Sequence, residues 1–267
     1  MDKTLVPAYL RSNRDLIRNL GKQADYGAVN PRYYAPELLS LNSSLRKIAR
    51  DFPIGSQIFR EDILDLIAKR RIYDACVLTM VWGGMSLIPK IKGELTSTPF
   101  AKFIRIPEHV VELSWERIID GIRNEEWDVL FADFEPDGGY KLEGVGLSFF
   151  TKLFFFAGWS LDEIQIKPLI LDKWTCTAYC ALLLEAGQLE KTNELFRGYN
   201  KDYGAQPRFG SSRSRLYRYF IEDMNEWSLA LDVTPDKLEQ FIFGWSKKVK
   251  KPNNPRDHFE GVCEEYF

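Results

Sequence analysis

The chain has 267 residues, of which 45% are hydrophobic, 14% aromatic and 28% charged, and its net charge is −2. This size and apolar content suffice for one large core or two closely packed subdomains. The charged fraction, and the lack of any run of about 18 apolar residues, exclude a membrane span. The N-terminus, with Asp2, Lys3 and Arg11, lacks the apolar core of a signal peptide, so a cytoplasmic location is expected.

The composition does not favour a metal site or disulfide bonds. The four cysteines are too few and too scattered for a disulfide framework, and there are only two histidines. Cys176 and Cys180 lie one helical turn apart in an apolar stretch, which favours buried free thiols. No zinc ion and no iron–sulfur cluster is therefore expected. Because the net charge is close to zero, any contact with nucleic acid must come from a local basic patch.

Apolar residues recur at spacings of three and four along the chain, whereas alternating patterns are short and rare, and this periodicity predicts an all-α fold. Helices are expected at residues 7–20, 36–50, 60–81, 107–121, 124–133, 147–157, 172–186, 211–231 and 235–248.

Local signals support some of these boundaries. Thr234-Pro235-Asp236 offers a capping hydroxyl, a proline for the first turn and an early acid. Glycine, proline and threonine predict an irregular loop over 83–100. The lysine-rich stretch at 247–251 predicts a solvated basic tail over 247–267.

The most informative segment is Leu142-Glu143-Gly144-Val145-Gly146, which enters an apolar helix containing Ser148. A Gly-Val-Gly turn before a helix lets backbone amides approach a phosphate, because glycine permits close contact and the helix N-terminus carries partial positive charge. An ordinary tight turn is the alternative.

A second segment, Pro168-Leu169-Ile170-Leu171-Asp172, is an apolar run that ends in an acid at the start of a helix. Taken alone, Asp172 is an ordinary N-cap of the helix that begins at Lys173. Its position after the glycine-rich turn gives it a second interpretation.

Together the two segments resemble the helix-hairpin-helix DNA glycosylases, which include endonuclease III, the adenine glycosylase that removes adenine opposite oxidised guanine, and the 8-oxoguanine glycosylases. That family has a leucine-x-glycine-valine-glycine hairpin, followed by a proline- and aliphatic-rich approach to an essential aspartate. Ser148-Phe149-Phe150-Thr151-Lys152 is most similar to a divergent bacterial branch with an 8-oxoguanine-glycosylase-type fold. The motif resemblance covers roughly residues 138–180.

The resemblance implies one glycosylase-like domain over 1–267, built from two packed helical subdomains. The helix-hairpin-helix element would span about 134–158 and a C-terminal helical segment about 211–248, before the basic tail. DNA is the implied partner, with no membrane and no obligate protein partner evident. No cofactor is implied, although the hairpin admits a monovalent cation.

The resemblance also implies the chemistry. Asp172 would stabilise the positive charge that develops on the sugar and would orient or deprotonate an attacking water. Gly144, Val145, Gly146 and Ser148 would hold the DNA backbone. Ser148 occupies the lysine position of the bifunctional enzymes, as a serine does in the monofunctional adenine glycosylases. The spacing from hairpin to aspartate is longer than in the best-known members.

Lys152 lies one helical turn beyond Ser148 and on the same face. It is a candidate Schiff-base nucleophile, or a charge that activates the leaving base. A surface lysine or one that contacts a phosphate is the alternative.

A flipped base needs a pocket with aromatic faces. The candidates from the sequence are Trp82, Gly83, Trp174, Tyr217, Met224 and Trp227. Packing in the core is the alternative for each aromatic residue.

A cluster of arginines at 208–218 is the best local electrostatic footprint for phosphates, with Arg213 and Arg215 as the leading candidates. A solvated, basic helix start is the alternative.

The sequence thus predicts a DNA glycosylase that leaves an abasic site. Oxidised guanine is the default substrate, and a modified phage base such as glucosylated hydroxymethylcytosine, which would make the protein an antiviral one, stays open. A catalytically silent helix-hairpin-helix DNA-binding protein and a helical scaffold for another protein are the alternatives.

Overall fold

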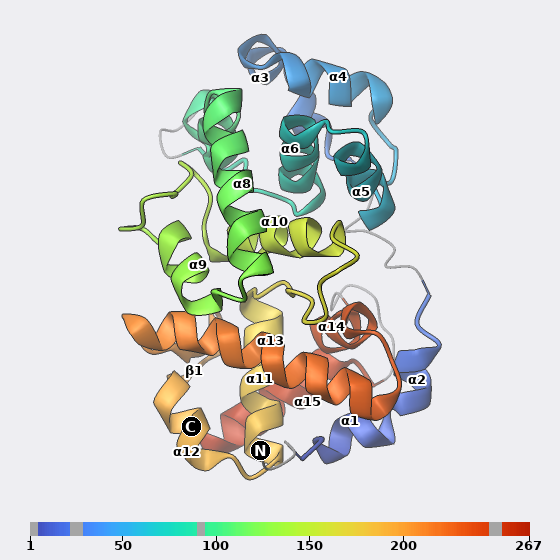
Figure 1. The fold of residues 1–267 in the computed structure, drawn as a ribbon, viewed down its shortest axis with the longest axis vertical. Coiled ribbons are helices and arrows are strands. Elements are labelled where there is room, and N and C mark those ends of the chain that lie inside the picture. The colour runs from blue at the N-terminus through green and yellow to red at the C-terminus, as the bar shows by residue number, and fades with distance from the viewer. Residues whose placement is uncertain (1–4, 22–28, 90–93, 246–252) are drawn as a thin grey trace. The chain divides into compact units, whose positions relative to one another are not determined.

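The computed structural model describes residues 5–21, 29–89, 94–245 and 253–267, which form two compact units (Figure 1). We call residues 22–126 and 132–164 the hairpin unit, and residues 1–21, 127–131 and 165–267 the aspartate unit. Helices dominate both units, which confirms the predicted all-α class apart from one short pair of strands.

The described part of the hairpin unit contains helices and loops but no strand. Its elements are η1 (Pro31–Tyr34), α3 (Pro36–Leu41), α4 (Ser43–Asp51), α5 (Arg60–Ala68), α6 (Ile72–Trp82), η2 (Leu95–Ser97), α7 (Pro99–Phe103), α8 (Glu108–Arg123) and α10 (Leu147–Trp159). Helix α9 (Trp127–Phe134) begins in the aspartate unit and ends in the hairpin unit. Helix α10 packs against α8, α6 and α5, and its residues from Phe150 to Gly158 are all buried because the sequence is apolar around most of the helix.

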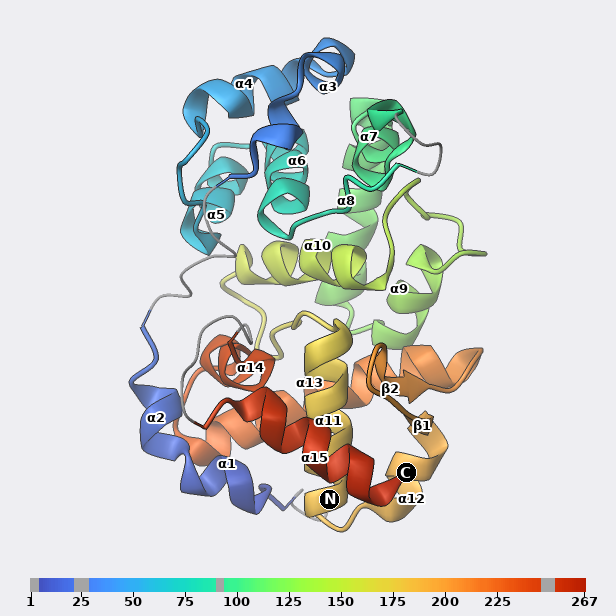
Figure 2. The same ribbon diagram turned by 180° about the vertical axis from the view of Figure 1, so that it is seen from behind.

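The aspartate unit is organised around α11 (Lys173–Glu185). The other elements are α1 (Ala8–Ser12), α2 (Arg14–Arg18), α12 (Leu189–Leu195), β1 (Phe196–Asn200), β2 (Gly204–Pro207), α13 (Ser211–Leu231), α14 (Pro235–Phe243) and α15 (Pro255–Tyr266). Strands β1 and β2 form an antiparallel hairpin. Helix α11 packs against α14, α15 and β2, and Figure 2 shows α15 running across it. The side chains of α11 from Thr175 to Leu183 are buried on all faces.

Three of the expected helices are divided where the backbone changes locally. Asn13 separates α1 from α2. The side chain of Asn42 accepts a hydrogen bond from the Leu45 N–H, which starts α4 anew after α3. Arg70 adopts a left-handed conformation with φ +57° between α5 and α6. Apolar periodicity continues across each of these points and therefore does not reveal them.

Some elements were absent from the sequence prediction. Helix α7 begins at the end of the expected loop 83–100, and α12 and the β-hairpin were not expected. The predicted basic tail is wrong for α15, whose side chains Phe259 and Cys263 are buried. The lysines at 247–251 and the end of the helix expected at 235–248 lie outside the described residues. None of the described helices has the length and apolarity needed to cross a membrane.

A buried ionic network ties three helices of the aspartate unit together. The carboxylate of Asp223 on α13 is only 5% exposed. It accepts hydrogen bonds from Tyr179 Oη on α11 and from Lys191 Nζ on α12, each at 2.6 Å. Burial raises the pKa of Asp223, whereas the charge of Lys191 opposes that shift. The lysine therefore compensates a carboxylate that would otherwise be costly to bury.

We expect Lys191→Met to lower the free energy of unfolding by about 3 kcal/mol, because it leaves a buried charge without its partner. Asp223→Asn should cost only about 1 kcal/mol, since Asn still accepts from Tyr179 and the partly exposed Lys191 can turn to water. Urea unfolding followed by circular dichroism compares the two variants. Equal losses would contradict this account of the network.

Candidate active site

The glycine-rich turn between α9 and α10 has a defined geometry. The Val145 N–H donates to the Leu142 carbonyl at 3.1 Å, and Gly144 has φ +83°, as the third residue of a type II turn requires. A Cβ on Gly144 would lie 2.3 Å from the carbonyl oxygen of Pro99. Both the backbone conformation and the close approach to α7 therefore demand glycine at this position.

Neighbouring side chains fix this turn to the hairpin unit. Leu142 and Val145 are buried, and Glu143 accepts from Lys102 Nζ of α7 at 2.6 Å. The turn is thus held from inside by apolar contacts and at the surface by an ion pair. Its position does not depend on a ligand.

Gly146, in contrast, has no structural reason to be glycine. It is exposed, its φ is −101°, and an added Cβ would meet no atom of the described residues within 4 Å. The N–H groups of Phe149 and Phe150 bond to the Gly146 carbonyl, but those of Leu147 and Ser148 have no acceptor within the described part of the chain. The N-terminus of α10 is therefore open to an anion.

Ser148 and Lys152 meet on α10. The Ser148 hydroxyl makes no hydrogen bond with any described residue, whereas its carbonyl accepts from Lys152 Nζ at 2.7 Å. Lys152 is only 3% exposed, and its Nζ lies 5.0 Å from the ring centre of Phe149. A Cβ on Gly83 would lie 2.9 Å from Lys152 Cδ and Cε. The structure thus brings together two predicted site residues, Gly83 and Lys152, and the glycine makes room for the lysine.

Trp82, the neighbour of Gly83, lies in the core of the hairpin unit. It is 3% exposed and packs edge-on against Phe156, with ring centres 5.4 Å apart. The guanidinium carbon of Arg60 lies 5.7 Å from its ring centre. The ring exposes no face to a base, so the burial supports the core alternative.

Asp172 caps α11. Its Oδ1 accepts from the N–H groups of Trp174 at 2.8 Å and Thr175 at 3.1 Å, while its own N–H donates to Thr175 Oγ1 at 2.8 Å. This reciprocal arrangement is a capping box. Asp172 Oδ2 makes no hydrogen bond with the described residues, and the side chain is half-buried. The cap therefore occupies one carboxylate oxygen and leaves the other without a hydrogen bond to the described residues.

The segment leading to Asp172 is fixed by polar groups from α13 and α14. Asn225 exchanges two hydrogen bonds of 2.9 Å with the backbone of Lys167. Glu239, which is buried, accepts from the Ile170 N–H at 3.0 Å. The last residues before Asp172 are thus held in place independently of the cap.

Three of the predicted pocket residues lie along one face of α13, as the sequence indicated, but that face is turned into the core. Tyr217, Met224 and Trp227 have no exposed surface. Tyr217 Oη donates to the Leu169 carbonyl at 3.2 Å, and burial raises the pKa of this tyrosine. Because they are fully packed, the prediction that they line a base pocket is corrected to a core role, in which Tyr217 supports the approach to Asp172.

Trp174 remains accessible beside Asp172. Its half-buried ring lies 4.5 Å from Lys173 Nζ and 4.2 Å from the guanidinium carbon of Arg256. Arg256 is buried and donates to the Phe243 carbonyl at 2.6 Å. The sequence prediction missed Arg256 because it assigned this region to a tail, although Asn254-Pro255 is a helix-start signal of the same kind as Thr234-Pro235.

The predicted arginine cluster is partly neutralised. Arg215 pairs with Glu194 at 2.6 Å, and Arg218 pairs with Asp128 at 2.8 Å. Arg213 lies beside the ring of Phe209, with its guanidinium carbon 5.8 Å from the ring centre. Arg215 must therefore release a carboxylate before it can bind a phosphate.

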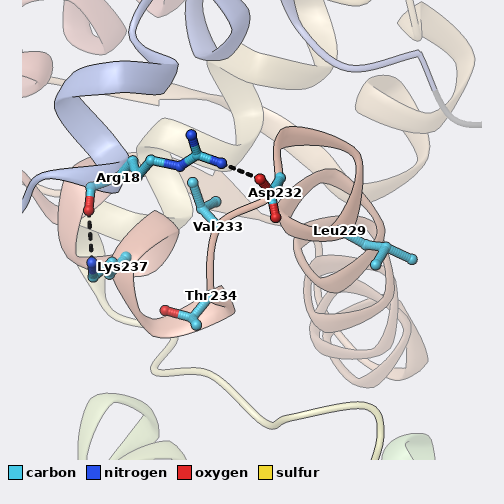
Figure 3. A pocket seen from close by; sticks show the side chains of 6 residues that line it. All are labelled: Arg18, Leu229, Asp232, Val233, Thr234 and Lys237. Carbon is cyan, nitrogen blue, oxygen red and sulfur yellow. Dashed lines mark hydrogen bonds and ion pairs between the residues drawn. The ribbon is translucent and has the colours of Figure 1, made fainter.

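A hollow of about 290 Å³ in the aspartate unit contains none of the predicted residues (Figure 3). Arg18 pairs across it with Asp232, and Lys237 Nζ donates to the Arg18 carbonyl at 2.7 Å. No aromatic side chain is among the six residues that line it. It therefore lacks the faces that would hold a flipped base.

Comparison with known proteins identifies a family to which the chain is similar. Searches of curated proteins and of solved structures found no match. A family model described as "Putative 8-oxoguanine DNA glycosylase OGG-like protein" matches residues 29–243, which include the hairpin, Lys152 and Asp172. The match spans most of the chain and agrees with the helical fold and the glycine-rich turn. The chain therefore belongs to the OGG-like family of 8-oxoguanine DNA glycosylase-type proteins.

Proposed function

We propose that this protein is a DNA glycosylase that flips out a damaged or modified base and hydrolyses its N-glycosidic bond, leaving an abasic site. The observation that carries the proposal is the carboxylate of Asp172. One oxygen caps α11, and the other makes no hydrogen bond with the described residues. Family membership supports the same activity in general terms.

The hairpin would hold the DNA backbone. A phosphate oxygen can approach Gly146 and accept from the Leu147 and Ser148 N–H groups, which have no other described acceptor. Gly144 and Val145 shape the turn that presents them. Such contacts position DNA without reading its sequence.

The reaction requires few groups. As the bond from C1′ to the base nitrogen breaks, the electron pair leaves with the base and positive charge develops on the sugar. The Asp172 carboxylate would stabilise this charge and take a proton from the water that adds to C1′. Trp174 and Gly83 are the predicted pocket residues that keep exposed surface, and we retain them as candidates for contact with the base.

Lys152 fits a hydrolytic enzyme better than a lyase. Its amine is buried and bonded to the Ser148 carbonyl, so it is not placed to attack a sugar. Ser148 itself carries no amine. We therefore propose a monofunctional glycosylase. The positive charge of Lys152, which lies beside Gly83, would activate the leaving base.

The substrate is proposed from the family alone. Oxidised guanine comes first, because the family description names it. A bulky modified cytosine of phage DNA is the second candidate and would imply an antiviral role. Both belong in the same panel of substrates.

The catalytically silent DNA-binding protein remains the second candidate function, because the capping box accounts for Asp172 without any chemistry. Such a protein would bind DNA through the hairpin and release no base. The Asp172 variants separate the two functions.

We expect Asp172→Asn to reduce single-turnover base release by about 10³-fold. Asparagine is as good an N-cap as aspartate, so the melting temperature should be nearly unchanged, whereas Asp172→Ala should lose about 1 kcal/mol of stability as well. Base release is measured by mass spectrometry on oligonucleotides with oxidised guanine and on modified phage DNA. Release by Asp172→Asn at the wild-type rate would refute the catalytic assignment.

The two hairpin glycines should respond differently to alanine. Gly144→Ala should destabilise the fold by about 2 kcal/mol or more, because φ is positive and Pro99 leaves no room. Gly146→Ala should fold normally but bind DNA about tenfold more weakly, because its methyl group would stand where a phosphate approaches. Thermal melts and fluorescence anisotropy measure the two effects. If Gly146→Ala bound as well as wild type, the hairpin would not be the phosphate site.

Borohydride should trap no covalent adduct between the protein and substrate DNA, because Lys152 Nζ is sequestered. A denaturing gel of protein incubated with labelled DNA and borohydride detects any such adduct. An adduct that disappears in Lys152→Ala would instead establish Lys152 as a Schiff-base nucleophile.

A further inference from the structure

The β-hairpin of β1 and β2 is a part of the aspartate unit to which the reaction as proposed assigns no role (Figure 2). It is docked on α11. The Ala205 N–H donates to Thr177 Oγ1 at 3.0 Å, and a Cβ on Gly204, where φ is +74°, would lie 2.3 Å from that oxygen. Strand β2 is therefore fixed closely against the helix that Asp172 caps.

The turn of the β-hairpin is tethered to the first residue of α11. Lys173 Nζ donates to the carbonyl oxygens of Lys201 at 3.3 Å and Asp202 at 2.6 Å. Lys173 directly follows Asp172, so the turn is tethered to the same end of α11 as the proposed catalytic carboxylate. Tyr203, in this turn, is 71% exposed.

At the other end of the β-hairpin, the exposed ring of Phe209 lies beside two arginines. Arg197 is the extra residue of an irregularity in β1, which displaces it from the regular strand register. Its guanidinium carbon lies 4.3 Å from the ring centre of Phe209, and that of Arg213 lies 5.8 Å away. Phe209 is 66% exposed. Arg197 makes no ion pair or hydrogen bond with its side chain anywhere in the described part of the chain.

An exposed aromatic ring with ordered guanidinium groups beside it is a suitable binding surface for a nucleic-acid strand. Arginine that stacks on a ring is pre-organised to meet phosphates, and further exposed aromatic rings stack on bases irrespective of sequence. Glu194 of α12 already pairs with Arg215. A protein partner would favour an apolar pocket around the ring, and here arginines flank it.

We propose that this β-hairpin binds the DNA strand that carries the flipped nucleotide. Arg197 and Arg213, ordered by Phe209, contact its phosphates, and Tyr203 stacks on a base next to the flipped nucleotide. The inference rests on the proposed function, since the position of Asp172 sets which strand lies here. It adds a binding element that the helix-hairpin-helix turn does not supply.

Fluorescence anisotropy with a labelled duplex containing a stable abasic-site analogue tests the proposal. Arg197→Ala should raise the Kd about tenfold and reduce the slope of log K against log salt by about one. Phe209→Ala should have a similar effect, and Tyr203→Ala should raise the Kd about fivefold or more. Arg197→Lys, which keeps the charge but not the planar stack, should fall between Arg197→Ala and wild type.

Arg11→Ala is the matched control, because it removes an exposed arginine from α1 of the same unit. It should change the Kd less than about twofold. Variants of Arg197, Phe209 and Tyr203 that all bind like this control, while wild type binds DNA, would overturn the β-hairpin inference and leave the proposed function standing. Failure of wild type to bind any DNA would overturn both.

Discussion

The N-cap of α11 fixes the side chain on which the proposed function depends. Asp172 Oδ1 satisfies two helix amides, and Thr175 returns the bond to the Asp172 N–H. These bonds fix the orientation of the carboxylate by the same forces that start the helix. Because the cap uses a single oxygen, capping would not compete with the proposed catalytic role. Oδ1 of Asp172 is the capping oxygen, and Oδ2 is the oxygen to which the proposal assigns catalysis.

One residue that suggested a base pocket, together with two other polar side chains, supports the segment before Asp172. Tyr217 holds the Leu169 carbonyl, and Asn225 and Glu239 hold the neighbouring backbone at Lys167 and Ile170. A strand-like approach without sheet partners would otherwise leave its polar groups unsatisfied. These contacts transmit the rigidity of the packed α13 and α14 to Asp172. Precise placement of a reacting group requires such support.

The sequence predicted those parts of the fold that depend on local periodicity and caps. Helix α13 was expected at its observed bounds, and α11 was expected to start after Asp172. The β-hairpin was not predictable from periodicity, because its strands are short and Arg197 breaks their alternation. In the site, sequence singled out both hairpin glycines but could not distinguish them. The difference lies in Pro99, which is distant in sequence and blocks Gly144 but not Gly146.

A crystal structure of Asp172→Asn bound to DNA that contains an intact substrate base tests the catalytic role of Asp172 most directly. If Asp172 is catalytic, the nucleotide is flipped, residue 172 lies within about 3.5 Å of its sugar, and its capping bonds to α11 persist. A phosphate should also lie at the Leu147 and Ser148 amides. A complex in which residue 172 only caps the helix and lies far from every sugar would show that Asp172 is not catalytic.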